Sequence, residues 1–114
     1  MSRVAVVNVR GLRTPEQRAT VVYCGRAFAG WPESPWHNPF RPGDTSDEER
    51  AKCIEMYRGL VSRMKYVSLM LGTLWHACNH GAKPLGCWCA PKACHCDVLA
   101  DMLNERFADK RSDD

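Results

Sequence analysis

The amino-acid sequence predicts an α/β fold, a small sandwich of about three mainly parallel strands with three helices. Short apolar runs rich in β-branched residues alternate with loops and with stretches whose apolar residues recur at helical spacing. A helical crossover between two strands usually makes them parallel neighbours in one sheet. With 114 residues, we expect a single domain over 1–107 and a frayed polar tail over 108–114.

The three expected strands cover residues 4–9, 21–24 and 85–89. The first two runs are each followed by an arginine, Arg10 and Arg26. In open α/β sheets, ligands bind beyond the carboxyl ends of the strands. If the three strands are parallel, both arginines and the segment after the third strand meet at that edge.

The stretch at about 26–46 predicts an ordered irregular loop. It contains four prolines, which exclude a helix or a central strand, and also Trp31, Trp36 and Phe40. We expect these aromatic side chains to pack on the domain near the site, and Asn38, before a proline, to shape a ligand pocket. Residues 11–20 are also expected to form a loop.

Three helices are predicted by capping and periodicity. Ser46 and Glu49 fit a capping box at the start of the first. Apolar residues then recur at helical spacing over 53–64 and over 67–78, with Gly81 as a plausible stop. The last helix is marked by the apolar positions within 98–103.

Charge, hydropathy and cysteine content limit the classes of protein to which this chain is expected to belong. The net charge of +3 is mixed along the chain and does not by itself indicate a nucleic-acid-binding protein, although nucleic acid is not excluded as a partner. The longest uncharged stretch, 66–82, is too polar to span a bilayer. Without a signal-peptide pattern, we expect a cytoplasmic protein, and seven cysteines there favour metal binding or reactive thiols over disulfides.

Four of the seven cysteines and one histidine fall between residues 87 and 96. Cys87 and Cys89 are two apart on a strand and face the same side. Positions two apart on a helix diverge by about 200°, so Cys94 and Cys96 are not expected to face one metal ion if the helix has already begun at Cys94. The favoured set of zinc ligands is Cys87, Cys89, Cys94 and His95.

A second interpretation of the same segment needs no metal. A cysteine and a histidine at a helix N-terminus favour a thiolate or a bound anion. The site is then a nucleotide-like or phosphorylated-ligand pocket, with or without a cysteine nucleophile. Its candidate catalytic residues are Cys89, Cys94, His95 and Asp97, and its candidate ligand-binding residues are Arg10, Arg26 and Asn38. A third interpretation is a set of small buried cysteines beside a solvated histidine.

Several motifs resemble one known family, the domain of unknown function 4326. They are Val7-Asn8-Val9-Arg10, Val22-Tyr23-Cys24-Gly25-Arg26, Asn38-Pro39-Phe40, and Gly86-Cys87-Trp88-Cys89-Ala90-Pro91 continuing through Cys94-His95-Cys96-Asp97-Val98-Leu99. The resemblance implies a short protein of the kind frequent in actinobacteria and their bacteriophages, with a strand-end site. The family pattern carries over to Cys87, Cys89, Pro91, Cys94, His95 and Asp97. His37 and Cys96 depart from it, since the family usually has glycine and a small residue there.

The combined prediction is a zinc-binding module that acts through a partner such as a host protein or a nucleic acid. The alternative is an enzyme or binder of a nucleotide-like or phosphorylated ligand. A phage-encoded inhibitor that works through surface contacts is the third class.

Overall fold

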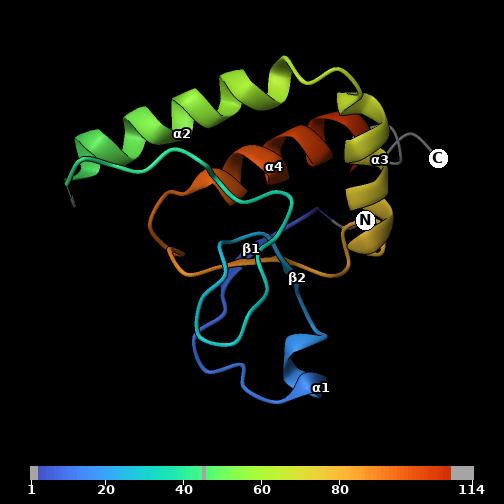
Figure 1. The fold of residues 1–114 in the computed structure, drawn as a ribbon. Coiled ribbons are helices and arrows are strands. Elements are labelled where there is room, and N and C mark those ends of the chain that lie inside the picture. Colours follow the sequence, from blue (N-terminus) through green and yellow to red (C-terminus); the bar gives the residue numbers. More distant parts are fainter. Residues whose placement is uncertain (1–2, 45, 109–114) are drawn as a thin grey trace.

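The computed structural model describes residues 3–44 and 46–108, and it confirms the α/β fold (Figure 1). A three-stranded parallel sheet is combined with three helices of nine residues or more and one short helix. Residues 109–114 of the predicted tail and Thr45 of the predicted loop lie outside the described residues. In chain order the elements are β1 (Val6–Asn8), α1 (Pro15–Arg18), β2 (Val22–Tyr23), α2 (Asp47–Ser62), α3 (Val67–Ala77), β3 (Leu85–Cys87), α4 (His95–Leu103) and the π-helical turn η1 (Asn104–Ala108).

The last strand in the sequence, β3, lies in the middle of the sheet. The strand order is β1-β3-β2, and β3 is parallel to both neighbours. Gly86 pairs with Val7 on one side and with Tyr23 on the other. A Cβ atom at Gly86 would lie 2.5 Å from Val9 Cγ1, so only glycine fits at this close approach.

The three long helices cover one face of the sheet. Figure 1 shows α2 and α4 side by side above the strands, and α4 packs on β1 and β3. Alternate strand residues face this layer, because successive side chains point to opposite sides of a strand. Leu85 and Cys87 belong to the main core under the helices, together with Leu71, Leu74, Val98, Leu99 and Leu103.

The opposite face of the sheet has a smaller core. Val9, Val21 and Trp31 are buried there, and Trp88 packs against them. Trp31 and Trp36 come from the same irregular loop, yet Trp36 belongs to the main core. The loop therefore reaches both faces of the sheet. The sequence predicted that its aromatic residues pack on the domain, but not that they divide between two cores.

Helix α1 corrects the expectation that residues 11–20 form a loop. Thr14 is its N-cap and accepts a hydrogen bond from Gln17 N at 3.1 Å. Gln17 Oε1 accepts in return from Thr14 N at 3.1 Å. This is the reciprocal capping box, here built with glutamine and with Pro15 in the first turn.

The predicted cap of α2 forms in part. Ser46 Oγ accepts from Glu49 N at 3.2 Å, as expected. The Glu49 carboxylate accepts from Gly43 N instead of from Ser46 N, so the box is not reciprocal and the acid holds the preceding loop. Helix α3 ends at Ala77, before the predicted stop at Gly81, because Asn79, His80 and Gly81 adopt left-handed φ angles.

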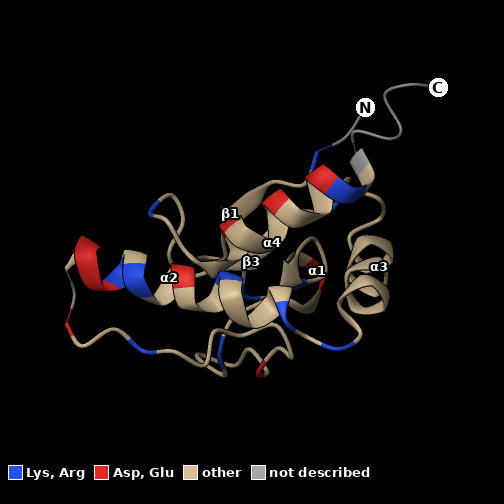
Figure 2. Cartoon of the chain, turned by 90° about the horizontal axis from the view of Figure 1, so that it is seen from above, with Lys and Arg blue, Asp and Glu red and all other residues tan. Residues whose placement is uncertain are grey.

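Charged residues of both signs are mixed over the surface, and α3 carries none (Figure 2). Among the described residues, none of the helices has the length and apolar character needed to cross a membrane.

Candidate functional site

A tight turn follows β3 and carries the cysteines. Lys92 N donates to Cys89 O at 2.8 Å, and the Ala90–Pro91 peptide is cis. The side chain of Asn8, at the end of β1, holds this turn by donating to the carbonyl oxygens of Trp88 at 3.1 Å and Ala90 at 2.8 Å. The carboxyl ends of two adjacent strands are thus tied together, as expected for parallel strands.

Three cysteine side chains converge at this point. The sulfur atoms of Cys87, Cys94 and Cys96 all lie within 4.8 Å of one another, and all three residues are buried. Cys87 Sγ and Cys94 Sγ are 3.3 Å apart. One sulfur comes from the end of β3, one from the residue before α4 and one from its first turn.

Cys94 and Cys96 do not diverge, because the condition for it, a helix that has already begun at Cys94, is not met. Cys94 is the N-cap of α4, with an extended φ of −153°, and the helix begins only at His95. The 100° rotation per helical residue therefore does not apply between positions 94 and 96. Because the backbone is extended at Cys94 and becomes helical only at His95, the sulfur atoms of Cys94 and Cys96 both lie close to that of Cys87.

Cys89 is the fourth cysteine of the turn. It faces the same side of the sheet as Cys87, while Trp88 packs in the opposite core, as predicted. Its thiol interacts with Cys87 and Cys94, and these hydrogen bonds raise the Cys89 pKa. Cys89 is half-buried and lies outside the set of three mutually close sulfurs.

Hydrogen bonds among the thiols make Cys87 the first to ionise. Donation from Cys89, then from Cys94 and Cys96, lowers the Cys87 pKa well below the usual thiol range. The Cys96 pKa is raised by its hydrogen bonds, first to Cys24 and then to Cys87. The cluster is thus arranged to hold negative charge on Cys87, which is a requirement for a metal-binding thiolate.

His95 lies beside the cysteines, but its ring is engaged elsewhere. Nε2 is 2.6 Å from the carbonyl oxygen of Cys24, and since that oxygen only accepts, Nε2 carries the proton. The same nitrogen is 3.8 Å from Cys96 Sγ. Burial lowers the His95 pKa, so the ring is neutral at pH 7 and Nδ1 is unprotonated. Neither ring nitrogen of His95 belongs to the group of possible ligand atoms that lie within 4.8 Å of one another.

Asp97 serves the helix terminus. Its Oδ2 atom accepts from Cys94 N at 2.9 Å, which makes it the N3 partner of a capping box. The carboxylate also suits the positive end of the helix dipole. Asp97 was a candidate catalytic residue, and this hydrogen bond gives its carboxylate a structural role.

Cys87, Cys89 and Cys94 form part of the wall of a cavity of about 480 Å³. The wall also includes Arg26 and Asn38, which were candidate ligand-binding residues, together with His95. Arg26 Nη2 donates to the carbonyl oxygens of Asn38, at 2.5 Å, and Phe40, at 2.8 Å, so this arginine also shapes the loop. Arg10 is exposed and does not line the cavity, and its backbone N–H donates to Asn8 Oδ1.

Sequence reasoning missed two further arginines in the cavity wall, Arg41 and Arg50. Helical spacing was a usable signal for Arg50, because it lies three and four residues before Cys53 and Ile54, which line the same cavity. It also missed Asn8, which contacts the turn only through backbone carbonyl groups. Such contacts leave no pattern in the sequence of the turn.

Comparison with known proteins identifies the family of this chain but gives no individual relative. No curated protein and no solved structure is similar enough to this chain to count as a match. A family model, described as "Domain of unknown function (DUF4326)", matches residues 7–105, a span that includes all of the sheet except Val6, together with the cysteine turn and α4. The chain therefore belongs to the DUF4326 family.

Proposed function

We propose that this domain is a zinc-binding module in which Cys87, Cys94 and Cys96 hold the ion. The observation that carries the proposal is the convergence of three buried sulfur atoms, from three points of the backbone, within 4.8 Å of one another. Thiolates are preferred zinc ligands. The metal would then join the central strand to the last helix.

The residues fit a zinc ion in size and charge. Zn–S bonds of about 2.3 Å at tetrahedral angles place sulfur atoms about 3.8 Å apart. The 3.3 Å between Cys87 and Cys94 requires only a small outward movement of the two side chains. The lowered pKa of Cys87 supplies a thiolate, which supports metal binding near pH 7.

Cys89 is the proposed fourth ligand. Its thiol already interacts with Cys87 and Cys94, and it lies at the cavity wall. His95, the alternative from the sequence, is turned toward the carbonyl oxygen of Cys24. In this arrangement His95 supports the neighbouring cysteines and does not bind the metal ion.

The experiment is elemental analysis of tag-free protein purified without oxygen. We expect one equivalent of zinc in the wild-type protein and loss of it in Cys94→Ser and Cys96→Ser. Cys78→Ala is the matched control, because Cys78 is buried in the main core and is not part of the cluster. Absence of metal from the folded wild-type protein would overturn the proposal.

Cobalt substitution identifies the fourth ligand. The intensity of thiolate-to-cobalt charge-transfer absorption rises with the number of bound sulfurs. We expect it to fall in Cys89→Ser and to stay unchanged in His95→Gln. The opposite pattern would restore the ligand set that contains His95.

The alternative function, an enzyme with a cysteine nucleophile, has less support. The raised pKa of Cys89 keeps this candidate protonated at pH 7, and the Asp97 carboxylate binds Cys94 N. Alkylation of the reduced, metal-free protein separates the two functions. A reaction of Cys89 or Cys94 much faster than that of Cys53 would favour the enzyme, and slow reaction of both would exclude these two candidate nucleophiles.

A further inference from the structure

The cavity beside the cysteine turn has features that the zinc proposal does not use. Its wall is assembled from the segment after β2, the irregular loop, the first turns of α2 and the cysteine turn. Its volume of about 480 Å³ is in the range of pockets that take small organic ligands, roughly 300–1,000 Å³.

The cavity is strongly positive. Arg26, Arg41 and Arg50 line it, whereas Glu33 is the only carboxylate among its lining residues, all of which are described. Within residues 3–44 and 46–108, none of these three arginines forms an ion pair. Burial, and next the charge of Arg41, lower the Arg26 pKa, so these two guanidinium groups feel each other's charge. A bound anion would reduce this electrostatic repulsion.

Arg50 has a polar atom without a partner. Its Nε is buried and makes no hydrogen bond, and it is the one buried side-chain nitrogen or oxygen of this kind among the described residues. Buried polar groups in proteins are nearly always hydrogen-bonded, and an exception calls for an absent partner. A ligand oxygen in the cavity would satisfy it.

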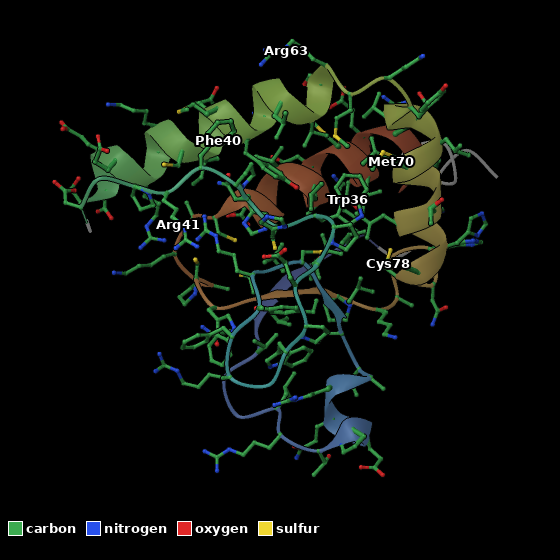
Figure 3. The ribbon with its side chains drawn as sticks, in the orientation of Figure 1. Trp36, Phe40, Arg41, Arg63, Met70 and Cys78 are labelled. Atoms are coloured by element: carbon green, nitrogen blue, oxygen red, sulfur yellow. The ribbon has the colours of Figure 1, made fainter. Side chains whose placement is uncertain are left out.

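Aromatic rings form another part of the wall. Phe28 is 62% exposed although it is a large apolar residue. Its ring meets that of Trp88 edge to face, with 5.1 Å between the centroids, and both line the cavity. Phe40 also lines it, and Figure 3 shows Phe40 against α2 and Arg41 between the loop and the cysteine turn. An exposed ring next to cationic groups suits a ligand with a flat ring and an anionic group.

The N-terminus of α4 does not compete for this anion. Asp97 already places a carboxylate there, bound to Cys94 N. The arginine end is therefore the place for a negatively charged group.

We propose that this cavity binds a nucleoside monophosphate, with the phosphate at Arg41 and Arg50 and the base against Phe28. Guanidinium groups match phosphate oxygens in pairs of hydrogen bonds. Arg26 holds the loop carbonyls and positions Phe40 and Arg41. The inference does not depend on a bound metal.

Calorimetric titration of the reduced full-length chain with each of the four ribonucleoside 5′-monophosphates tests the proposal. We expect saturable binding of at least one of them. Inorganic phosphate and ribose 5-phosphate should bind at least 10-fold more weakly, since they lack the base. The corresponding nucleoside should also bind at least 10-fold more weakly, since it lacks the charge.

Three variants locate the site. Arg41→Gln and Arg50→Gln should each raise the dissociation constant at least 10-fold. Arg63→Gln, at the opposite end of α2 (Figure 3), should leave it unchanged. A circular dichroism spectrum and a urea midpoint equal to the wild type confirm that each variant is folded.

Three outcomes would overturn the proposal. The first is that none of the four nucleotides binds saturably. The second is that the nucleoside binds as tightly as its monophosphate. The third is that Arg41→Gln and Arg50→Gln bind the nucleotide with the affinity of the wild type. Repeating the titration after metal removal separates this result from the zinc proposal. Binding that survives removal belongs to the arginine cavity alone.

Discussion

The side-chain amide of Asn8 donates a hydrogen bond to the carbonyl oxygen of Ala90 over 2.8 Å, although 82 positions separate them in the sequence. The same nitrogen donates to Trp88 O, and Oδ1 accepts from Arg10 N at 2.7 Å. One side chain thus links the end of an edge strand to the cysteine turn.

Replacing Asn8 should therefore loosen the turn. We expect Asn8→Ala to lower the free energy of unfolding by about 1–3 kcal/mol, because the turn carbonyls lose their donors. Urea denaturation measures this change. Asn8→Asp keeps the acceptor for Arg10 N but cannot donate when ionised, so it should be destabilised as well. An unchanged urea midpoint in both variants would contradict the assigned role.

Two glycines should respond to alanine with opposite signs. At Gly86 a Cβ would lie 2.5 Å from Val9 Cγ1 and 3.1 Å from Val21 Cγ2, so Gly86→Ala should destabilise the domain by about 1–3 kcal/mol or more. At Gly72 in α3 nothing lies within 4 Å of the added atom, and Gly72→Ala should stabilise by about 0.5–1 kcal/mol. Thermal unfolding of the two variants checks both signs. A melting temperature that does not fall in Gly86→Ala would contradict the close approach of Val9 and Val21 to this position, and one that falls in Gly72→Ala would contradict the open space at α3.

Arg18 fastens the irregular loop over the smaller core. Its guanidinium donates to the carbonyl oxygens of Leu12, Ala29 and Gly30 at 3.1–3.2 Å and lies 4.8 Å from the centroid of the Trp31 ring. Lysine lacks the planar guanidinium group and cannot place its donors at these three carbonyl oxygens in the same way. We expect Arg18→Lys to cost about 1–2 kcal/mol in urea denaturation.

Arg13→Lys is the matched control for Arg18→Lys. Arg13 is exposed, and its backbone N–H rather than its side chain contacts Gln17. A loss of stability in Arg13→Lys as large as that in Arg18→Lys would show that the loss does not come from the hydrogen bonds of the Arg18 guanidinium.

The stability of the metal-free protein should depend on pH through His95. Burial lowers its pKa in the folded state below the value of about 6.5 in the unfolded chain. The unfolded state then binds more protons as the pH falls through that window, so stability decreases on acidification, by up to about 1.4 kcal/mol per pH unit. Urea denaturation between pH 7.5 and 5.5 should show a smaller decrease in His95→Gln. Identical slopes would mean that His95 is not buried as a neutral ring.

The strands and long helices could be predicted because each has a local signal. Residues 4–9, 21–24 and 85–89 contain β-branched or apolar runs, and Ser46 precedes the helix that it caps. The observed strands are shorter because pairing with β3 decides where each one ends, and β3 itself has three residues. Helix α1 was missed because Thr14 and Gln17 form a capping box without an apolar face.

Only part of the set predicted at the sheet edge lies together in the structure, since Arg26 lines the cavity with the cysteine turn and Arg10 does not. Parallel strands bring Arg26 and the cysteine turn to one edge, which follows from the order of elements. The position of Cys96 depends on whether α4 begins before or after Cys94, and sequence patterns locate helix ends only to within a residue or two. Arg41 enters the cavity through the path of an irregular loop, which no periodicity specifies.

The central position of β3 governs the order of events during synthesis. Both β1 and β2 pair only with β3 in the described sheet, and β3 begins at Leu85 of 114 residues. A nascent chain that has not yet exposed this strand holds two strand segments without a partner, so the sheet can close only after β3 has been synthesised. The core residues of α2 and α3 lack the sheet as a packing partner until then, which leaves their apolar side chains open to contacts with other molecules.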